Sequence, residues 1–545
     1  MAGEVSTSAK EVAKGTFWGV AGNLAFKLVS FFYTVILARM ATQDDIGIFY
    51  LALSIVSLLA LFVDFGISQS FARYIPFFNA RGEGKNIEKM LRAGYSICTV
   101  LALISFIVIF FGADMIAGYY QNPGLSDSLR YLSPYLLIYI LFQLNTVFLQ
   151  GQKKIHSIAL TSNLQNLAKL VLSISLFIVI GANVFTISIG YLFSYVVAVL
   201  FSFFLVWKGL KHLEGKQEQN VYSYGKLLRE LLPFGLMMIA AMSMWTIIGY
   251  IDRVMIGYFL PPDIAAAQVA IYTMATSLAG LIMMFPSAIG TIFFPVVSQL
   301  FGQKKLDEMR KICATSTRWL LFITVPLALV FVTFSKQILN MFYGELYVPG
   351  ALALSLFAIG LLIRAATMVP SYVLAGMRLV RIEIKIAAVA AAVNIILNVG
   401  LIPSYGIDGA AAASAVSFLV ATALFIWYSK KHFGFEIDRG TWQIVIAALL
   451  SFLTAFLLEP FISPMVDGLP LSGVEYLDKV ARLSVLAALF LVSVIVFAAI
   501  SLALKSFREE DLGIMEGAMR RGRAPASAIR LLRSIVSLGI SREKS

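Results

Sequence analysis

The sequence contains little charge, little cysteine and little histidine. Only 13% of its 545 residues are Asp, Glu, Lys or Arg, and it has two Cys and three His. Soluble globular proteins carry roughly 25% charged residues, so this composition argues against a soluble protein. No spacing of His, Cys and carboxylates resembles a metal site, and we expect neither a metal nor another cofactor. Cys98 and Cys313 lie in or beside apolar segments, where packing is a more common role than a disulfide.

Two sequence motifs are also missing. The chain has no GxxxxGK(S/T) phosphate-binding loop, which argues against ATP hydrolysis. It also shows no cleavable signal peptide. Residues 1–14 are polar, and the apolar run that follows is too long for the core of a signal peptide. We therefore expect this run to remain as the first membrane span.

Long apolar runs recur from one end of the chain to the other. The chain is 59% hydrophobic, and a helix of about 20 apolar residues spans the hydrocarbon core of a bilayer. The sequence therefore predicts an all-α polytopic membrane protein with about fourteen transmembrane helices. The predicted spans are 15–38, 46–66, 90–112, 130–150, 156–180, 184–207, 229–251, 266–292, 312–334, 350–374, 382–403, 408–429, 441–462 and 480–504.

These spans group into two sets of six, followed by an appended pair. The predicted segments are a cytoplasmic N-terminus (1–14), an N-lobe (15–207), a cytoplasmic linker (208–228), a C-lobe (229–429), two appended spans (430–504) and a cytoplasmic basic tail (505–545). We expect a monomer.

The basic residues fall mainly on one side of this predicted topology. Most of the 43 Lys and Arg residues lie in the N-terminus, in alternate loops and in the C-terminal tail. The positive-inside rule makes this side cytoplasmic, so both termini face the cytoplasm of a cell membrane. The net charge of +13 is then a topology signal, and we expect no nucleic-acid binding. A basic amphipathic stretch, 526–540, either lies on anionic lipids or belongs to a disordered tail.

The second half of the chain repeats the pattern of the first half. The stretch from Asp44 to Gly66 matches the stretch from Pro262 to Pro286, and a second match, at a spacing of 225 residues, places Gly181 and Gly406 in equivalent short turns. Six spans return the chain to its starting side. The two halves therefore have the same orientation, as in transporters built from parallel repeats, which alternate the access to a central site.

Three cations lie alone near the middle of predicted spans: Lys27, Lys169 and Arg364. A charge within the hydrocarbon is costly, and such residues usually face an interior cavity. Other polar residues lie at helical spacing from these cations, including Asn23 near Lys27 and Asn166 near Lys169. This spacing indicates a polar helix face. We expect a cavity that is lined only by positive charge and suits an anionic cargo. An alternative is that helix-end carbonyls or a buried carboxylate hold each cation.

Other predicted spans carry further polar stripes. We expect that these also contribute to the cavity, with Tyr139, Gln143, Tyr250 and Arg253 among the binding residues. Two carboxylates lie near span ends, Asp64 in the first half of the chain and Asp252 in the second. We assign Asp64, Arg73 and Asp252 to gating or ion pairs. For Asp64, an ion pair with Arg73 or Lys27 and a helix cap remain equal alternatives.

The sequence resembles a known family over its first twelve spans. The stretch ILARMATQDDIGIFYLALSIVSLLALFVDFGISQSFARYIPFF (36–78) resembles the opening of polysaccharide-biosynthesis flippases of the Wzx type, and IDRVMIGYFLPPDIAAAQVAIYTMATSL (251–278) resembles the start of their second half. These flippases belong to the MOP superfamily, together with MATE multidrug antiporters and lipid II flippases. The resemblance implies two six-helix lobes around a central cavity that contains cations. It also implies a cargo of oligosaccharide on a polyprenyl phosphate or pyrophosphate.

We considered three classes of function. The first is a flippase that moves an anionic lipid-linked oligosaccharide to the outer leaflet by alternating access. The second is a cation-coupled multidrug antiporter of the same fold, which needs a carboxylate in the middle of the membrane. The third is a membrane-embedded glycan enzyme, which needs catalytic outer loops or a DxD-like metal site. The short outer loops disfavour the enzyme, and we expect no enzymatic activity.

Overall fold

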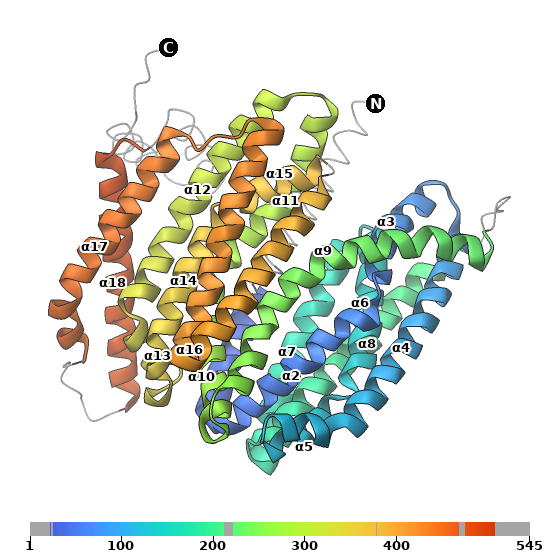
Figure 1. Ribbon diagram of the computed structural model, residues 1–545, viewed down its shortest axis with the longest axis horizontal. Coiled ribbons are helices and arrows are strands. Elements are labelled where there is room, and N and C mark those ends of the chain that lie inside the picture. The colour runs from blue at the N-terminus through green and yellow to red at the C-terminus, as the bar shows by residue number, and fades with distance from the viewer. Residues whose placement is uncertain (1–21, 23–24, 212–221, 378, 468–474, 507–545) are drawn as a thin grey trace. The chain divides into compact units, whose positions relative to one another are not determined.

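The computed structural model describes residues 22, 25–211, 222–377, 379–467 and 475–506. Within these ranges every regular element is a helix (Figure 1). Ten of the described helices are long and apolar enough to cross a membrane, so the protein is a multi-pass helical membrane protein. The number fourteen stays a prediction, because the first predicted span lies partly outside the described residues. Asn23, the N-terminus 1–14 and the amphipathic stretch 526–540 also lie outside them.

The chain divides into two compact units. Unit 1 comprises Met1–Ser277 and Ala387–Ala413, and unit 2 comprises Leu278–Ile386 and Ser414–Ser545. The predicted lobe boundaries stay a prediction. The helices of unit 1 are α2 (Gln43–Asp64), α3 (Ile67–Ala80), α4 (Gly84–Tyr119), α5 (Pro123–Leu132), α6 (Tyr135–Gly151), α7 (Ile155–Ile180), α8 (Val184–Lys211), α9 (Tyr224–Phe259) and most of α10 (Pro262–Ala279).

Unit 2 is built mainly from the second half of the chain. Its elements are η1 (Gly280–Met283), α11 (Met284–Gly302), α12 (Leu306–Thr333), α13 (Ser335–Phe342), η2 (Glu345–Gly350), α14 (Ala351–Ala365), α15 (Met368–Gly376), α17 (Arg439–Asp467) and α18 (Glu475–Ala503). The long α16 (Val380–Phe433) contributes its middle part to unit 1 and its two ends to unit 2.

Glycines mark two interruptions that the sequence predicted as short turns. Gly181, which separates α7 from α8, has a φ of 98°. Gly406 has a non-helical backbone, with φ 57° and ψ −135°, inside α16. This break falls between the predicted spans 382–403 and 408–429. Glycine adopts positive φ without a steric penalty, which explains why the chain reverses or bends at these positions.

Four predicted spans are not continuous helices. The span 46–66 ends at Phe65 and Gly66, which have left-handed backbones (φ 45° and 75°), and α3 follows directly. A Cβ at Gly66 would lie 2.2 Å from the backbone of Gly235 in α9, so a side chain does not fit at this break. The other three breaks lie between α5 and α6, at η1, and between α14 and α15.

Proline explains these three breaks. A proline lacks the N–H group that would bond the carbonyl four residues earlier, and its ring clashes with that carbonyl. Pro134 directly precedes α6, and Pro286 and Pro370 are the third residues of α11 and α15, so each proline lies at the start of the helix that follows a break. By contrast, Pro233 and Pro326 lie inside the continuous helices α9 and α12.

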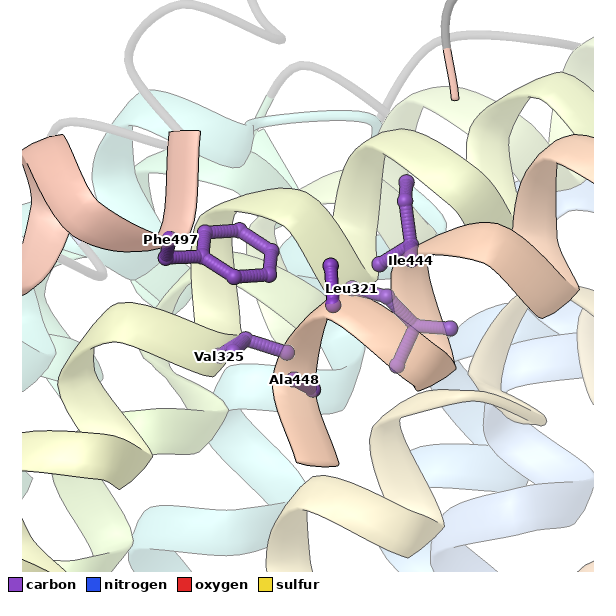
Figure 2. Packing of buried hydrophobic residues seen from close by; sticks show 6 residues of the cluster. Leu321, Val325, Ile444, Ala448 and Phe497 are labelled. Atoms are coloured by element: carbon purple, nitrogen blue, oxygen red, sulfur yellow. The ribbon is translucent and has the colours of Figure 1, made fainter. Parts of the chain in front are cut away.

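The two appended helices pack on α12. Leu321 and Val325 of α12 form a buried cluster with Ile444 and Ala448 of α17 and Phe497 of α18 (Figure 2). Near the start of α17, the buried Arg318 of α12 forms an ion pair with Asp438, with 2.6 Å between Nη1 and Oδ2. An apolar cluster and an ion pair therefore hold α17 and α18 within unit 2. Cys98 and Cys313 are both free and buried, in agreement with a packing role.

Candidate functional site

Unit 1 contains a cavity of about 740 Å³, within the size range of ligand sites. Helices α2, α6, α8 and α9 form most of its wall. The aromatic and polar residues that line it are Tyr50, Ser54, Ser57, Asp64, Gln69, Tyr135, Tyr139, Gln143, Tyr191, Tyr195, Trp245, Thr246, Tyr250 and Arg253. The remaining lining residues are aliphatic or glycine. The cavity thus combines several aromatic rings with a small number of polar groups.

One wall of the cavity consists of four tyrosines in mutual contact, Tyr135 and Tyr139 of α6 and Tyr191 and Tyr195 of α8, here called the tyrosine wall. Each pair is four residues apart, so both members lie on one helix face. The ring centroids of Tyr135 and Tyr139 are 5.2 Å apart in a stacked arrangement. Tyr135 and Tyr195 are 5.2 Å apart edge to face, and Tyr191 and Tyr195 are 5.4 Å apart. Such contacts fix the rings as a rigid aromatic surface.

Asp64 places a carboxylate in the cavity lining. Its Oδ1 accepts a hydrogen bond from the backbone N–H of Ser68 at 3.1 Å, so Asp64 caps the start of α3 across the helix break. The guanidinium of Arg73 lies 4.3 Å from the centre of the Phe234 ring. The expectation of a cavity lined only by positive charge is wrong for this cavity. Asp64 is the last residue of α2, near the end of its predicted span, and it lines the cavity there.

Arg253 is the cation among the lining residues. Its Nε donates to Oγ1 of Thr273 at 3.0 Å, and its Nη1 donates to the carbonyl of Gly249 at 3.0 Å. These bonds hold the guanidinium against α9 and α10. Tyr139, Gln143, Tyr250 and Arg253, which the sequence predicted as binding residues, all line the cavity.

Lys169, which the sequence predicted as a binding residue, does not line the cavity. Its side chain is buried, with a residue exposure of 7%. The Nζ atom lies 4.5 Å from the centre of the Tyr33 ring and 6.0 Å from that of Tyr191. The cation therefore lies beside one ring of the tyrosine wall, that of Tyr191, but is not part of the cavity lining.

Asn166 and Lys27, which the sequence also predicted as binding residues, lie outside the lining too. Asn166 is 1% exposed, one helical turn from Lys169 on α7. Lys27 is half-buried on the helical segment 25–40 and does not line the cavity. Sequence spacing identified the buried faces of these helices but not their distance from the cavity.

Arg364 belongs to unit 2, at the end of α14 beside the break before α15. Its guanidinium carbon lies 5.2 Å from the centre of the Phe418 ring, and it interacts electrostatically with Glu383. A carboxylate near Arg364 agrees with the alternative in which a buried carboxylate accompanies the cation. Glu383 lies at the start of α16, on a different helix from Arg364, so this electrostatic interaction was not predicted from the sequence.

Asp252 lies in a buried polar cluster within unit 1 and is 3% exposed. Its carboxylate accepts hydrogen bonds from Oη of Tyr272 at 2.5 Å and from Nδ2 of Asn398 at 2.7 Å. Nδ2 of Asn394 is 3.2 Å away. These donors offset the cost of burying the carboxylate and join α9, α10 and α16.

Unit 2 contains an apolar groove of about 800 Å³ between α12, α14, α16 and α17. Three threonines, Thr317, Thr422 and Thr441, are the polar residues among its lining. Large side chains such as Trp442 and Phe456 line it and are 53% and 75% exposed. The chemistry of this groove suits a hydrocarbon chain.

Much of the cavity wall was not predicted from the sequence. Tyr50, Tyr135, Tyr191, Tyr195 and Trp245 were not among the predicted binding residues. A signal was present, because a tyrosine recurs four residues later in both α6 and α8. In an apolar helix a tyrosine is also common at a packing contact, so the pattern alone did not distinguish a cavity wall from a helix interface.

Comparison with known proteins identifies this multi-pass helical protein as a transporter of the MOP superfamily. Its fold is similar to that of a solved structure of lipid II flippase MurJ in an inward closed conformation. The TM-score is 0.61, and the identity is 16% over 89% of this chain and 98% of that one. A family model described as polysaccharide biosynthesis protein matches residues 12–301, and one described as MatE matches residues 238–399. The chain belongs to the polysaccharide biosynthesis protein family.

Two relatives extend this similarity over most of the chain. An uncharacterised membrane protein of Methanocaldococcus jannaschii is 26% identical over 86% of this chain and 94% of its own length. A protein of Haloferax volcanii, named a probable low-salt glycan biosynthesis flippase, is 22% identical over 78% of this chain and 85% of its own. The similarity therefore covers both units.

Proposed function

We propose that this protein is an alternating-access flippase that moves an anionic lipid-linked oligosaccharide from the cytoplasmic to the outer leaflet of the cell membrane. The tyrosine wall is the observation that carries this proposal. Sugar rings have apolar C–H faces and polar hydroxyl edges, and a rigid aromatic surface with nearby amides and hydroxyls binds both. Gln69, Gln143 and Thr246 supply such polar groups in the same cavity.

The names of the relatives support the same class of cargo. One is a probable glycan biosynthesis flippase, and another, 21% identical over 81% of this chain, is the lipid II flippase MurJ of Bacillus subtilis. We infer a cargo with a glycan headgroup and a polyprenyl phosphate or pyrophosphate carrier. The apolar groove of unit 2 suits the carrier chain, and the bilayer itself is the alternative place for that chain.

The proposed direction follows from the charge of the cargo. An inside-negative membrane potential favours outward movement of negative charge by about 2.3 kcal/mol per charge per 100 mV. This free energy supports transport without ATP and without covalent chemistry. The direction also agrees with the predicted topology, in which both termini are cytoplasmic.

The first experiment asks whether the glycan accumulates. Depletion of the protein in its host should cause a build-up of lipid-linked oligosaccharide in the cytoplasmic leaflet, measured by mass spectrometry of extracted lipids. Unchanged lipid pools in depleted cells would refute the flippase.

A second experiment tests the tyrosine wall directly. The purified protein is placed in liposomes with the host's lipid-linked oligosaccharide, and transport is read from the access of a glycosidase. Aromatic contacts contribute roughly 1 kcal/mol each, so Tyr139→Ala with Tyr195→Ala should slow transport by about tenfold or more. Tyr139→Phe keeps the ring and should retain most of the rate. Tyr405→Ala, at an exposed site outside the cavity, serves as the control.

A cation-coupled multidrug antiporter is the second candidate. Asp64 favours it, because a carboxylate in the cavity provides the group that such coupling needs, and the MatE family model matches residues 238–399. Uptake of cationic dyes into inverted vesicles distinguishes the two functions. An antiporter would drive dye uptake from an imposed proton or sodium gradient and lose it in Asp64→Asn, whereas a flippase would show no gradient-driven dye uptake.

A further inference from the structure

The carboxylate of Asp64 and the guanidinium of Arg253 both line the cavity, but they lie toward opposite ends of it. Asp64 is the last residue of α2. Arg253 interacts electrostatically with Tyr50, which lies 14 residues before Asp64 on α2, about 21 Å along the helix. Coulomb attraction falls with distance, so at about 20 Å it is about one fifth of its value at about 4 Å. Arg253 therefore does not neutralise Asp64.

The contacts of Asp64 leave its carboxylate able to bind a ligand. Its Oδ1 accepts the N–H of Ser68 at 3.1 Å, which holds the carboxylate at the start of α3 and favours its ionised form. Among the described residues no Lys or Arg forms an ion pair with it. A carboxylate offers about four acceptor sites, so a ligand in the cavity can donate further hydrogen bonds to it.

Neutral polar groups accompany Asp64 in the lining. The hydroxyl of Tyr139 interacts electrostatically with Asp64. Gln143 follows Tyr139 by four residues on α6, so the two side chains lie on one face of that helix, and both line the cavity. Gln69 of α3 contributes a second amide to the lining. The cavity thus offers a carboxylate together with an aromatic ring and amide groups.

This set of groups suits an uncharged sugar. The hydroxyls of a sugar donate to a carboxylate, and a hydrogen bond to an ionised acceptor is roughly twice as strong as one between neutral groups. Amides both donate to hydroxyls and accept from them. A sugar that carries its own carboxylate, such as a uronic acid, would instead bring a second negative charge close to Asp64, and the two charges would repel each other.

We propose that Asp64 is a specificity-determining residue that accepts hydrogen bonds from the hydroxyls of a neutral sugar and excludes acidic sugars from its end of the cavity. This inference rests on the proposed function, because it takes the cargo to be a glycan. It narrows the substrate class. The negative charge of the cargo then lies on the carrier phosphate, and the sugars that bind beside Asp64 are uncharged.

A pair of matched sugars tests this selectivity. The probes are p-nitrophenyl β-glucoside and p-nitrophenyl β-glucuronide, which differ only at C6, where the first has a hydroxymethyl group and the second a carboxylate. Binding to the purified protein, in a detergent without a sugar headgroup, is titrated by saturation-transfer NMR. The measured quantity is the ratio of the two dissociation constants. The unmodified protein should favour the glucoside by about tenfold or more, the effect of one like charge at an effective dielectric constant of about 20.

Three variants separate charge from shape. Asp64→Asn keeps an oxygen for the N–H of Ser68, so the start of α3 stays capped. It should tighten the glucuronide by about tenfold and weaken the glucoside. Asp64→Glu retains the charge and should keep the preference for the glucoside. Asp127→Asn is the matched control, because Asp127 is exposed on α5 and does not line the cavity, and it should leave the ratio unchanged.

Several outcomes would overturn the inference. An unchanged ratio in Asp64→Asn means that Asp64 does not select the sugar. Equal weakening of both sugars means that Asp64 only maintains the shape of the cavity. The inference also fails if neither sugar binds to the unmodified protein. An unchanged ratio together with loss of gradient-driven dye uptake in Asp64→Asn would make Asp64 the coupling group of an antiporter.

The binding measurement needs no transport, so its result is separate from the test of the flippase. If the ratio changes as expected but depleted cells accumulate no lipid-linked oligosaccharide, Asp64 selects neutral sugars and the flippase is refuted. If the glycan accumulates but the ratio in Asp64→Asn is unchanged, the flippase stands and the role of Asp64 is refuted.

Discussion

The buried ion pair between Arg318 and Asp438 allows a quantitative prediction about the appended helices. The two side chains are only 3% and 12% exposed, and Nη1 lies 2.6 Å from Oδ2. Asp438 also caps α17, because its Oδ1 accepts the N–H of Thr441 at 2.9 Å. One carboxylate therefore serves both the contact between α12 and the start of α17 and the first turn of α17.

The structure sets the size of the expected effects. Two unit charges about 4 Å apart attract each other by about 4 kcal/mol at an effective dielectric constant of about 20. Removing one partner of a buried pair typically costs about 3–5 kcal/mol, because the other charge stays buried without compensation. Arg318→Met and Asp438→Ser should each therefore destabilise unit 2 by about 3 kcal/mol. Ser retains the helix cap, so the second variant removes the charge alone.

The double variant provides the decisive comparison. With both charges gone and the cap retained, Arg318→Met with Asp438→Ser should cost about 1 kcal/mol or less. The assay is thermal unfolding of the detergent-solubilised protein, followed by size-exclusion chromatography. Each single variant should lower the midpoint by roughly 6–12 °C, and the double variant should recover most of this loss. Additive losses in the double variant would refute the reasoning, since the two charges would then act independently.

Further predictions concern packing, and thermal unfolding tests each of them. Gly66→Ala should impair folding, because a Cβ would lie 2.2 Å from backbone atoms, whereas Gly112→Ala has open space and should be tolerated. Phe497→Ala removes a fully buried ring from the cluster of Figure 2 and should cost about 3–5 kcal/mol; a loss below 1 kcal/mol would contradict that packing. Tyr95→Phe removes the hydroxyl that donates to Asn145 and should cost about 1–3 kcal/mol, and an unchanged midpoint would argue against this bond.

The sequence predicted the class of the protein because hydropathy is a local property. A run of apolar residues identifies a membrane helix wherever its neighbours lie, and the all-helical multi-pass fold is confirmed. The helix breaks at spans 46–66, 130–150, 266–292 and 350–374 were not predicted, although three of them have a proline nearby. Proline also occurs inside the continuous helices α9 and α12, so its presence alone does not determine whether a helix ends.

The cavity was harder to predict, because it depends on which helix faces meet. Helical spacing identified the polar stripe of α7, but Lys169 is buried and does not line the cavity as predicted. The spacing could not show that Lys169 lies beside the ring of Tyr191 on α8, a residue that does line the cavity. Likewise, Glu383 interacts electrostatically with Arg364 from a different helix. The sequence around either residue does not predict this interaction. The sequence predicts how deep a residue lies within its span, but it does not predict which residue of another helix lies beside it.

The position of Trp245 in the cavity lining has a practical consequence. The chain has six tryptophans, and this one shares a cavity with six tyrosines. Tyrosine transfers excitation energy to a nearby tryptophan, and the indole emission responds to the polarity around it. A protein that retains Trp245 alone would therefore carry a built-in optical reporter of cavity occupancy. Loading and release of cargo would become visible in real time without any attached dye.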